Sequence, residues 1–219
     1  MTHAGKLPLP SAPHAPARRP SGARPQWRAG SDLPDRGTAP PPPLARRITA
    51  IHLPRFAMER WQRSLARRGE APPEDIPQAL ATEGPHGPVI HATNRAAEEA
   101  GVAAGARVVD MRALCPELRV EYADLAGDRA ALERLTLWAR RWCPWTATDG
   151  AAGLVMDTTG SDHLWGGEPE MLREIEARLS GLGVSSSLAV APTHGAAWAL
   201  ARFGADQASA VILTMDQPV

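Results

Sequence analysis

The stretch RRITAIHLPRFAMERW, residues 46–61, sets the fold of the chain. Residues 48–53 form a short apolar run with β-branched members, which is typical of a strand, and Phe56, Met58, Trp61 and Leu65 then recur at helical spacing. Pro54 stands between the two patterns, where a first-turn proline costs little because its missing N–H would have had no helical partner. The stretch therefore predicts a strand followed directly by a helix.

The same alternation of strand and helix continues to the end of the chain. Further strands are expected at 89–91, 118–122, 153–158 and 184–191, and further helices at 94–100, 106–114, 128–142, 168–182 and 193–203. Residues 69–88, rich in proline, glycine and acid, are expected to form a loop. Asn94 and Asp128 are predicted to be helix N-caps, and Gly101 is predicted to end a helix in a left-handed turn. This order predicts an α/β or α+β domain, a sheet with helices packed on it.

Residues 1–46 differ in composition from the rest. They hold half of the 22 prolines, and through Arg47 there are eight basic residues against Asp32 and Asp35, which leaves 16 basic and 22 acidic residues for the remainder. A segment of this kind buries too little apolar area to offset its ordering entropy, so a disordered tail is expected, or else residues from a mis-assigned translation start. A basic arm that touches DNA phosphates is the alternative.

Composition also excludes several classes of protein. Cys115 and Cys143 are the only cysteines, without zinc spacing or a secreted disulfide framework, and we expect both to be reduced and buried. No run approaches the ~20 apolar residues of a membrane span, and the N-terminus lacks the apolar region of a secretory signal. We therefore expect a cytoplasmic protein with no membrane association, and no motif indicates a cofactor.

Considered one at a time, few motifs contain residues that could take part in catalysis or ligand binding. Asp149 and Asp157 flank a predicted hairpin and could bind a divalent metal, but an Asp before a glycine is most often turn chemistry. His52 and His163 have no nucleophile or metal-ligand spacing nearby, which favours structural roles. The pairs Arg67-Arg68 and Arg140-Arg141 are read as solvated, with contact to phosphates as the alternative.

Taken together, four segments resemble the opening of the Y-family (UmuC/DinB-like) DNA polymerase domain, and more narrowly ImuB-type proteins. They are RRITAIHLPRFAMERW, NRAAEEAGVAAGARVVDMRALCPELRV, TDGAAGLVMDTTGSDHLWGG and SLAVAPTHGAAWALARFG, in this order within residues 47–213. The resemblance implies a palm-like α+β sheet with packed helices and a small helical fingers insertion over residues 47–219, ending before the thumb and little finger. It thus implies a natural truncation or a fragment.

The resemblance also implies which positions of this sequence correspond to the catalytic and nucleotide-binding residues of an active relative. The first-strand Asp corresponds to His52, Pro54 is the neighbouring metal-proximal position, and the hairpin's Asp-Glu pair corresponds to Asp149-Gly150. The nucleotide-binding Tyr and Arg of the fingers correspond to Arg95 and Glu98, and two later Lys correspond to His194 and Trp198. Only Asp149 retains a family-position carboxylate. The implied protein has no catalytic, metal-binding or nucleotide-binding residues and is not an enzyme.

The resemblance to ImuB-type proteins further implies a role in DNA repair and damage-induced mutagenesis. It implies a scaffold that joins an ImuA-type RecA-like partner to an error-prone replicative-type polymerase, with a sliding clamp bound only through a missing C-terminal part and DNA bound weakly if at all. Two alternatives stay open: an active translesion polymerase using Asp149 and Asp157, and a nonfunctional fragment. The first is disfavoured because these two residues lie roughly 25 Å apart if the chain between them is extended.

Overall fold

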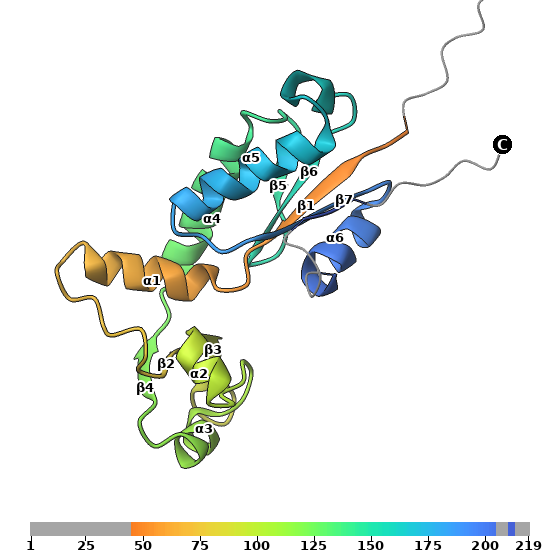
Figure 1. Ribbon diagram of the computed structural model, residues 1–219. Helices are drawn as coiled ribbons and strands as arrows, with labels where there is room; N and C mark the ends of the chain where they lie inside the picture. Colours follow the sequence, from red (N-terminus) through yellow and green to blue (C-terminus); the bar gives the residue numbers. More distant parts are fainter. Residues whose placement is uncertain (1–44, 205–209, 213–219) are drawn as a thin grey trace, which may run out of the picture. The chain divides into compact units, whose positions relative to one another are not determined.

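The main sheet of the protein is built around its first strand. The computed structural model describes residues 45–204 and 210–212. Five strands lie in the order β5 (Thr146–Thr148), β6 (Gly153–Asp157), β1 (Ile48–His52), β7 (Ser187–Ala191) and β8 (Ala210–Ile212). β1 is central and antiparallel to both of its neighbours, whereas β7 and β8 are parallel (Figure 1). The expected strand-helix unit is confirmed, because β1 leads directly into α1 (Phe56–Ala66).

The two faces of this sheet are packed differently. Alternate side chains, such as Ile51 of β1 and Leu188 of β7, face a large core beneath α4 (Leu125–Ala139) and α5 (Glu168–Gly181). Small residues between them, such as Ala50 and Ala189, face α6 (His194–Phe203). Because successive strand residues point to opposite faces and alanine leaves room, α6 lies close to β1 and β7 (Figure 1). A short 3-10 helix, Asp162–Trp165, precedes α5.

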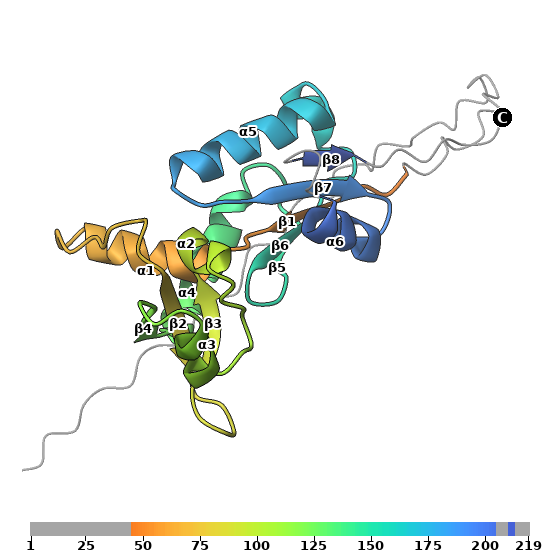
Figure 2. The same ribbon diagram turned by 60° about the horizontal axis from the view of Figure 1, so that its bottom comes forward.

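A second, three-stranded sheet occupies the segment between α1 and α4. Its order is β3 (Val89–Thr93), β2 (Gln78–Thr82) and β4 (Arg119–Tyr122), with β2 antiparallel to β3 and parallel to β4. The helices α2 (Arg95–Glu99) and α3 (Val108–Leu114) accompany it (Figure 2). It has its own core, which includes Ile90, Ala97 and Cys115. The expected helical insertion is therefore a mixed α/β unit.

Two local expectations were wrong. The loop expected over residues 69–88 contains β2, and residues 78–80 of this strand are almost fully buried. A short alanine-rich run beside prolines has no recognisable strand pattern. The conformation of this segment is decided instead by its pairing with a strand on each side. Asp128 is not an N-cap, because α4 begins one turn earlier with Asp124 as the cap, bonded to the Gly127 N–H. Asp128 is instead buried and ion-paired to Arg60.

Several other expectations are confirmed. Asn94 caps α2 through a bond from the Ala97 N–H, and Gly101 has a φ of 81°. Cys115 and Cys143 are both buried free thiols. No helix in the described ranges is long and apolar enough to cross a membrane. All but the last two residues of the proline-rich head, 1–46, lie outside the described residues, as do Leu213 to Val219.

Candidate functional site

The end of β1 brings together most of the residues that the sequence singled out. His52, the last residue of β1, pairs with Gly153 at the start of β6, and the Leu53 N–H donates to the Ala152 carbonyl at 2.9 Å. Beside them lies a cavity of about 300 Å³. Its lining includes His52, Asp149 and Gly150, together with Trp198 and Arg202 of α6. Residues from three distant segments thus form one cluster, which we call the β1-end cluster.

Asp149 sits in the turn between β5 and β6 and has a histidine as its partner. The turn is closed by the Asp149 N–H, which bonds to the Gly153 carbonyl at 2.8 Å, and Gly150 takes a φ of 63° that glycine adopts without strain. The carboxylate Oδ2 lies 3.0 Å from Nε2 of His194, the first residue of α6. The single carboxylate of the β1-end cluster is therefore already hydrogen-bonded within the protein.

His52 is half-buried at the floor of this cavity. Burial, followed by the positive charge of Arg202, lowers the pKa of the His52 imidazole below 6.5, while a hydrogen bond with the backbone at Ala152 acts in the opposite direction. Both dominant causes disfavour the charged ring. The β1-end cluster consequently holds a neutral imidazole near neutral pH.

The lowered pKa of His52 predicts a pH dependence of stability. The folded protein binds fewer protons at this site than the unfolded chain, so stability is lost as the pH falls below 6.5 and toward the folded pKa. We expect the unfolding free energy of the His52→Gln variant to decline less than that of the wild type between neutral pH and this acidic range. Chemical denaturation at a series of pH values measures this. Parallel pH profiles of the unfolding free energy for wild type and His52→Gln would contradict the assignment.

The contribution of Arg202 to the His52 pKa can be tested separately. Arg202→Gln should raise the pKa of His52 in an NMR titration.

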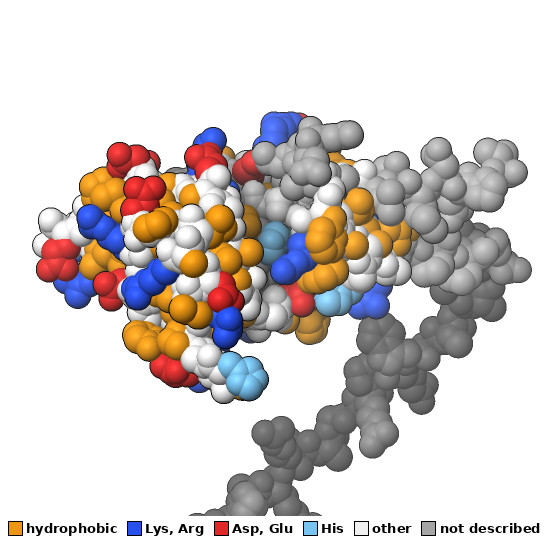
Figure 3. All heavy atoms as spheres, turned by 90° about the horizontal axis from the view of Figure 1, so that it is seen from below, with side chains coloured by type: hydrophobic (Ala, Val, Ile, Leu, Met, Phe, Trp, Pro, Cys, Tyr) orange, Lys and Arg blue, Asp and Glu red, His pale blue; other side chains and the backbone are white. Residues whose placement is uncertain are grey.

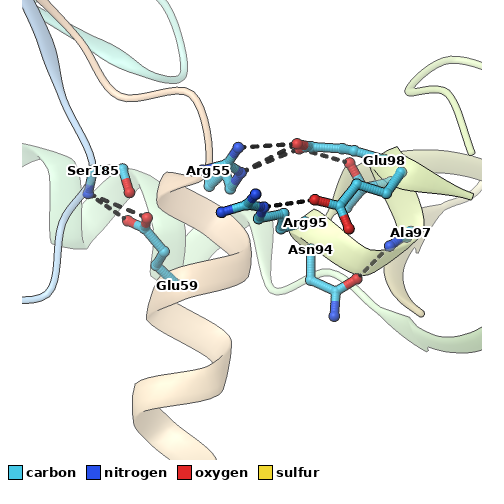
Figure 4. Close-up of polar contacts among 9 residues, drawn as sticks. Arg55, Glu59, Asn94, Arg95, Ala97, Glu98 and Ser185 are labelled. Atoms are coloured by element: carbon cyan, nitrogen blue, oxygen red, sulfur yellow. Dashed lines mark hydrogen bonds and ion pairs between the residues drawn. The ribbon is translucent and has the colours of Figure 1, made fainter. Parts of the chain in front are cut away.

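On α2, the two residues that the resemblance placed at a nucleotide are engaged in ion pairs. Glu98 accepts hydrogen bonds from Arg55, which precedes α1, with the shortest distance 3.0 Å, and also from the Thr93 hydroxyl. Arg95 pairs with Glu99 at 2.7 Å along the same helix. Figure 4 shows the Arg55 guanidinium directed at the Glu98 carboxylate across the space between α1 and α2. Arg55 thus provides a cation beside the carboxylate of α2.

Charge reversal tests this contact. Arg55→Glu and Glu98→Arg each place like charges together, and each should lower the unfolding free energy by about 0.5–1 kcal/mol because the pair is partly exposed. The double reversal should recover most of that loss, as measured by denaturant unfolding in a double-mutant cycle. If the effects of the two single changes simply add in the double variant, the pair contributes no coupling.

Asp157 is not brought to the β1-end cluster. It lies at the opposite end of β6, opposite Ile48, where Arg46 contacts its carboxylate at 3.3 Å. Hydrogen bonds from Thr159 are the main cause that lowers its pKa. His163 is exposed on the short 3-10 helix. Of the two carboxylates considered as metal ligands, the structure therefore places only Asp149 in the cavity.

The sequence interpretation missed Arg202 and Arg55. Arg202 follows His194 and Trp198 at intervals of four residues, so the three side chains recur along one face of the predicted helix 193–203, and this spacing was a usable signal. Nothing in the sequence marked Arg55, because its partner lies 43 residues away.

Figure 3 shows the distribution of charged side chains over one face of the protein. On the face shown in Figure 3, basic and acidic side chains lie intermixed among hydrophobic ones. Among the residues that the structure describes, no three His, Cys, Asp or Glu side chains are grouped so as to hold a metal ion. This face therefore lacks the continuous positive surface that a phosphate backbone favours.

The fold of the chain is similar to that of solved DNA polymerases. The chain superposes on an insertion ternary complex of Dbh DNA polymerase with a TM-score of 0.64 and 13% identity, covering 77% of this chain and 48% of that one. DinB from Sulfolobus solfataricus gives a TM-score of 0.61 at 13% identity, with 76% and 48% covered. The expected fold class is confirmed, and the chain spans about half the length of these polymerases.

A family model and two relatives with similar sequences are more specific than the similarity in fold. Residues 64–202 match the model of the impB/mucB/samB family, and the chain belongs to this family. It is 51% identical over 110 residues to proteins named ImuB from two strains of Caulobacter vibrioides, NA1000 / CB15N and ATCC 19089 / CIP 103742 / CB 15. The alignment covers 50% of this chain and 24% of each relative, so the matched part is about a quarter of their length. The resemblance to ImuB-type proteins is confirmed.

Proposed function

We propose that this chain is a non-catalytic, polymerase-like accessory protein of DNA repair and damage-induced mutagenesis, which acts as a scaffold for an error-prone polymerase during translesion synthesis. The observation that carries the proposal is the composition of the β1-end cluster. Among the described residues that line it, Asp149 is the one carboxylate, and His52, Trp198 and Arg202 lie in the same lining. In this proposal residues 47–219 form the palm and fingers, with the five-stranded sheet as the palm.

The donor set does not fit the metal centre of a polymerase. Nucleotidyl transfer uses two metal ions held mainly by carboxylates, and Mg²⁺ prefers an octahedron of oxygen ligands. Among the residues that the structure describes, the lining offers one carboxylate, which is hydrogen-bonded to His194, beside the imidazole of His52 and the guanidinium of Arg202. We therefore derive no metal-dependent step at this site.

The contacts of α2 support the same conclusion. A triphosphate is bound by cations, because charge-assisted hydrogen bonds to its oxygens are the strong ones. Glu98 presents a carboxylate there, and the Arg55 guanidinium that could serve a phosphate is bonded to it instead. Binding a nucleotide would require breaking this pair and placing phosphate beside Glu98.

The proposed partners follow from the resemblance to ImuB-type proteins. They are an ImuA-type RecA-like protein and an error-prone replicative-type polymerase, with the sliding clamp bound through parts of a longer protein. A pull-down with the full 219-residue chain from DNA-damaged cells tests this, with a full-length ImuB-type protein as the control. Recovery of either partner supports a scaffold, and recovery of neither when the control succeeds contradicts it for this chain.

A further inference from the structure

A groove lies between α1, α4 and the segment that follows α5, and it is separate from the β1-end cluster. Its volume is about 390 Å³. Its described lining combines arginines with apolar side chains and Ser64, and none of these described residues is a carboxylate. The residues that line it and enter the argument are Arg63, Arg67, Arg134, Leu135, Trp138 and Leu182.

The arginines of the groove are only partly neutralised. Asp124, the N-cap of α4, and Asp128 on α4 both pair with Arg60, and Glu59 of α1 accepts hydrogen bonds from the Ser185 N–H at 3.0 and 3.1 Å. Arg67 and Arg134 are exposed at the rim, one just after the end of α1 and the other on α4. The groove therefore presents positive charge from two helices.

Arg63 shows how closely these cations are gathered. It is partly buried, and it donates to the Gly183 carbonyl. Burial is the main cause that lowers the pKa of its guanidinium; Glu59 acts in the opposite direction, and the positive charges of Arg67 and Arg60 lower it further. An anion placed in the groove would relieve this repulsion between like charges.

The floor of the groove is apolar. Phe56, Leu135 and Val184 are buried beneath it, whereas Leu182 is 47% exposed and the Trp138 ring is partly buried. Arg141 lies over the Trp138 ring at 4.5 Å, a cation–π contact that holds this ring. A ligand that fits must therefore supply negative charge and an apolar side chain together.

We propose that this groove binds an acidic peptide segment of a partner protein, with carboxylates on Arg63, Arg67 and Arg134 and one bulky apolar side chain on the Trp138–Leu182 floor. A peptide matches both features, because a short segment carries carboxylates and an apolar anchor at once. A nucleic-acid backbone would satisfy the arginines but leave the apolar floor uncovered. The inference does not depend on whether the β1-end cluster performs chemistry.

The test is fluorescence anisotropy with the full chain and a labelled peptide of glutamate and serine around a single phenylalanine. Replacing Arg67 and Arg134 by Glu should weaken binding at least about tenfold, since two charge-assisted contacts are lost. The matched control is Arg112→Glu with Arg119→Glu, which makes the same charge change on α3 and β4 and should leave binding within about twofold. Leu182→Ser should weaken the phenylalanine peptide but not its phenylalanine-to-serine counterpart.

Three results would overturn the proposal. The first is that the peptide does not bind saturably. The second is that the Arg112/Arg119 control loses as much affinity for the peptide as the Arg67/Arg134 variant, which would mean that the peptide is attracted by the positive charge of the protein in general. The third is that duplex DNA displaces the peptide and binds the Arg67/Arg134 variant more weakly than the wild type. This result would mean that the groove binds nucleic acid. Thermal unfolding of each variant confirms that it is folded before binding is interpreted, and the exposed positions of Arg67, Arg134 and Leu182 make the substitutions tolerable.

Discussion

Replacing Leu188 by Ala should lower the free energy of unfolding by about 3 kcal/mol, one of the largest effects expected from a single change. Leu188 lies in β7 beside the central strand and is 1% exposed, in the core beneath α4 and α5. The loss combines the transfer free energy of the removed atoms with the cavity that a sheet fixed on both sides cannot close. Denaturant unfolding measures it, with a fall in melting temperature of roughly 10 °C.

Leu137→Ala is the matched control for this change. Leu137 is on α4 but 57% exposed, and alanine suits a helix well, so its effect should stay within about 0.5 kcal/mol. A small effect at both positions would mean that the core is loosely packed, as the nonfunctional-fragment alternative requires.

The second large effect is expected at Asn94, where Ala should cost about 3 kcal/mol. Its side-chain oxygen accepts from the N–H groups of Ala97 and Gln78, both at 2.9 Å, and its amide donates to the Ile76 carbonyl at 2.8 Å. Asn94 is 4% exposed. Truncation would thus remove a helix cap and leave three backbone groups, two of them buried, without this partner, which loosens β2 from α2.

Hydrogen exchange locates this effect, because the amides of β2 and α2 should lose protection before those of the main sheet. Thr193→Ala is the control, since Thr193 caps α6 in the same way but is exposed, and it should cost about 1 kcal/mol or less. Equal costs at the two caps would show that the additional bonds of Asn94 contribute nothing.

Much of the fold could be predicted because local patterns agree with it. The run after Arg47 and the helical spacing from Phe56 specify β1 and α1 through periodicity alone. β2 was missed because its burial depends on β3 and β4, which lie at a distance along the chain, and local propensity gives no such information. Asp128 was misassigned because a capping residue and a buried ion-pair partner look alike in sequence, and Arg60 is 68 residues away.

Several members of the site were predictable, but Arg202 and the contacts among the residues were not. The resemblance selected His52, Asp149, His194 and Trp198, and the structure gathers them at the end of β1. The pairs Asp149–His194 and Arg55–Glu98 join segments that no pattern relates, so only the fold reveals that these charges are already engaged.

Metal-dependent primer extension tests the central claim most directly. Purified protein is incubated with a primed DNA template, nucleoside triphosphates and Mg²⁺ or Mn²⁺, beside its Asp149→Ala variant and an active Y-family polymerase. The account predicts no extension above background by either the wild type or the variant. Extension by the wild type that requires the metal and disappears in Asp149→Ala would contradict it and establish an active translesion polymerase.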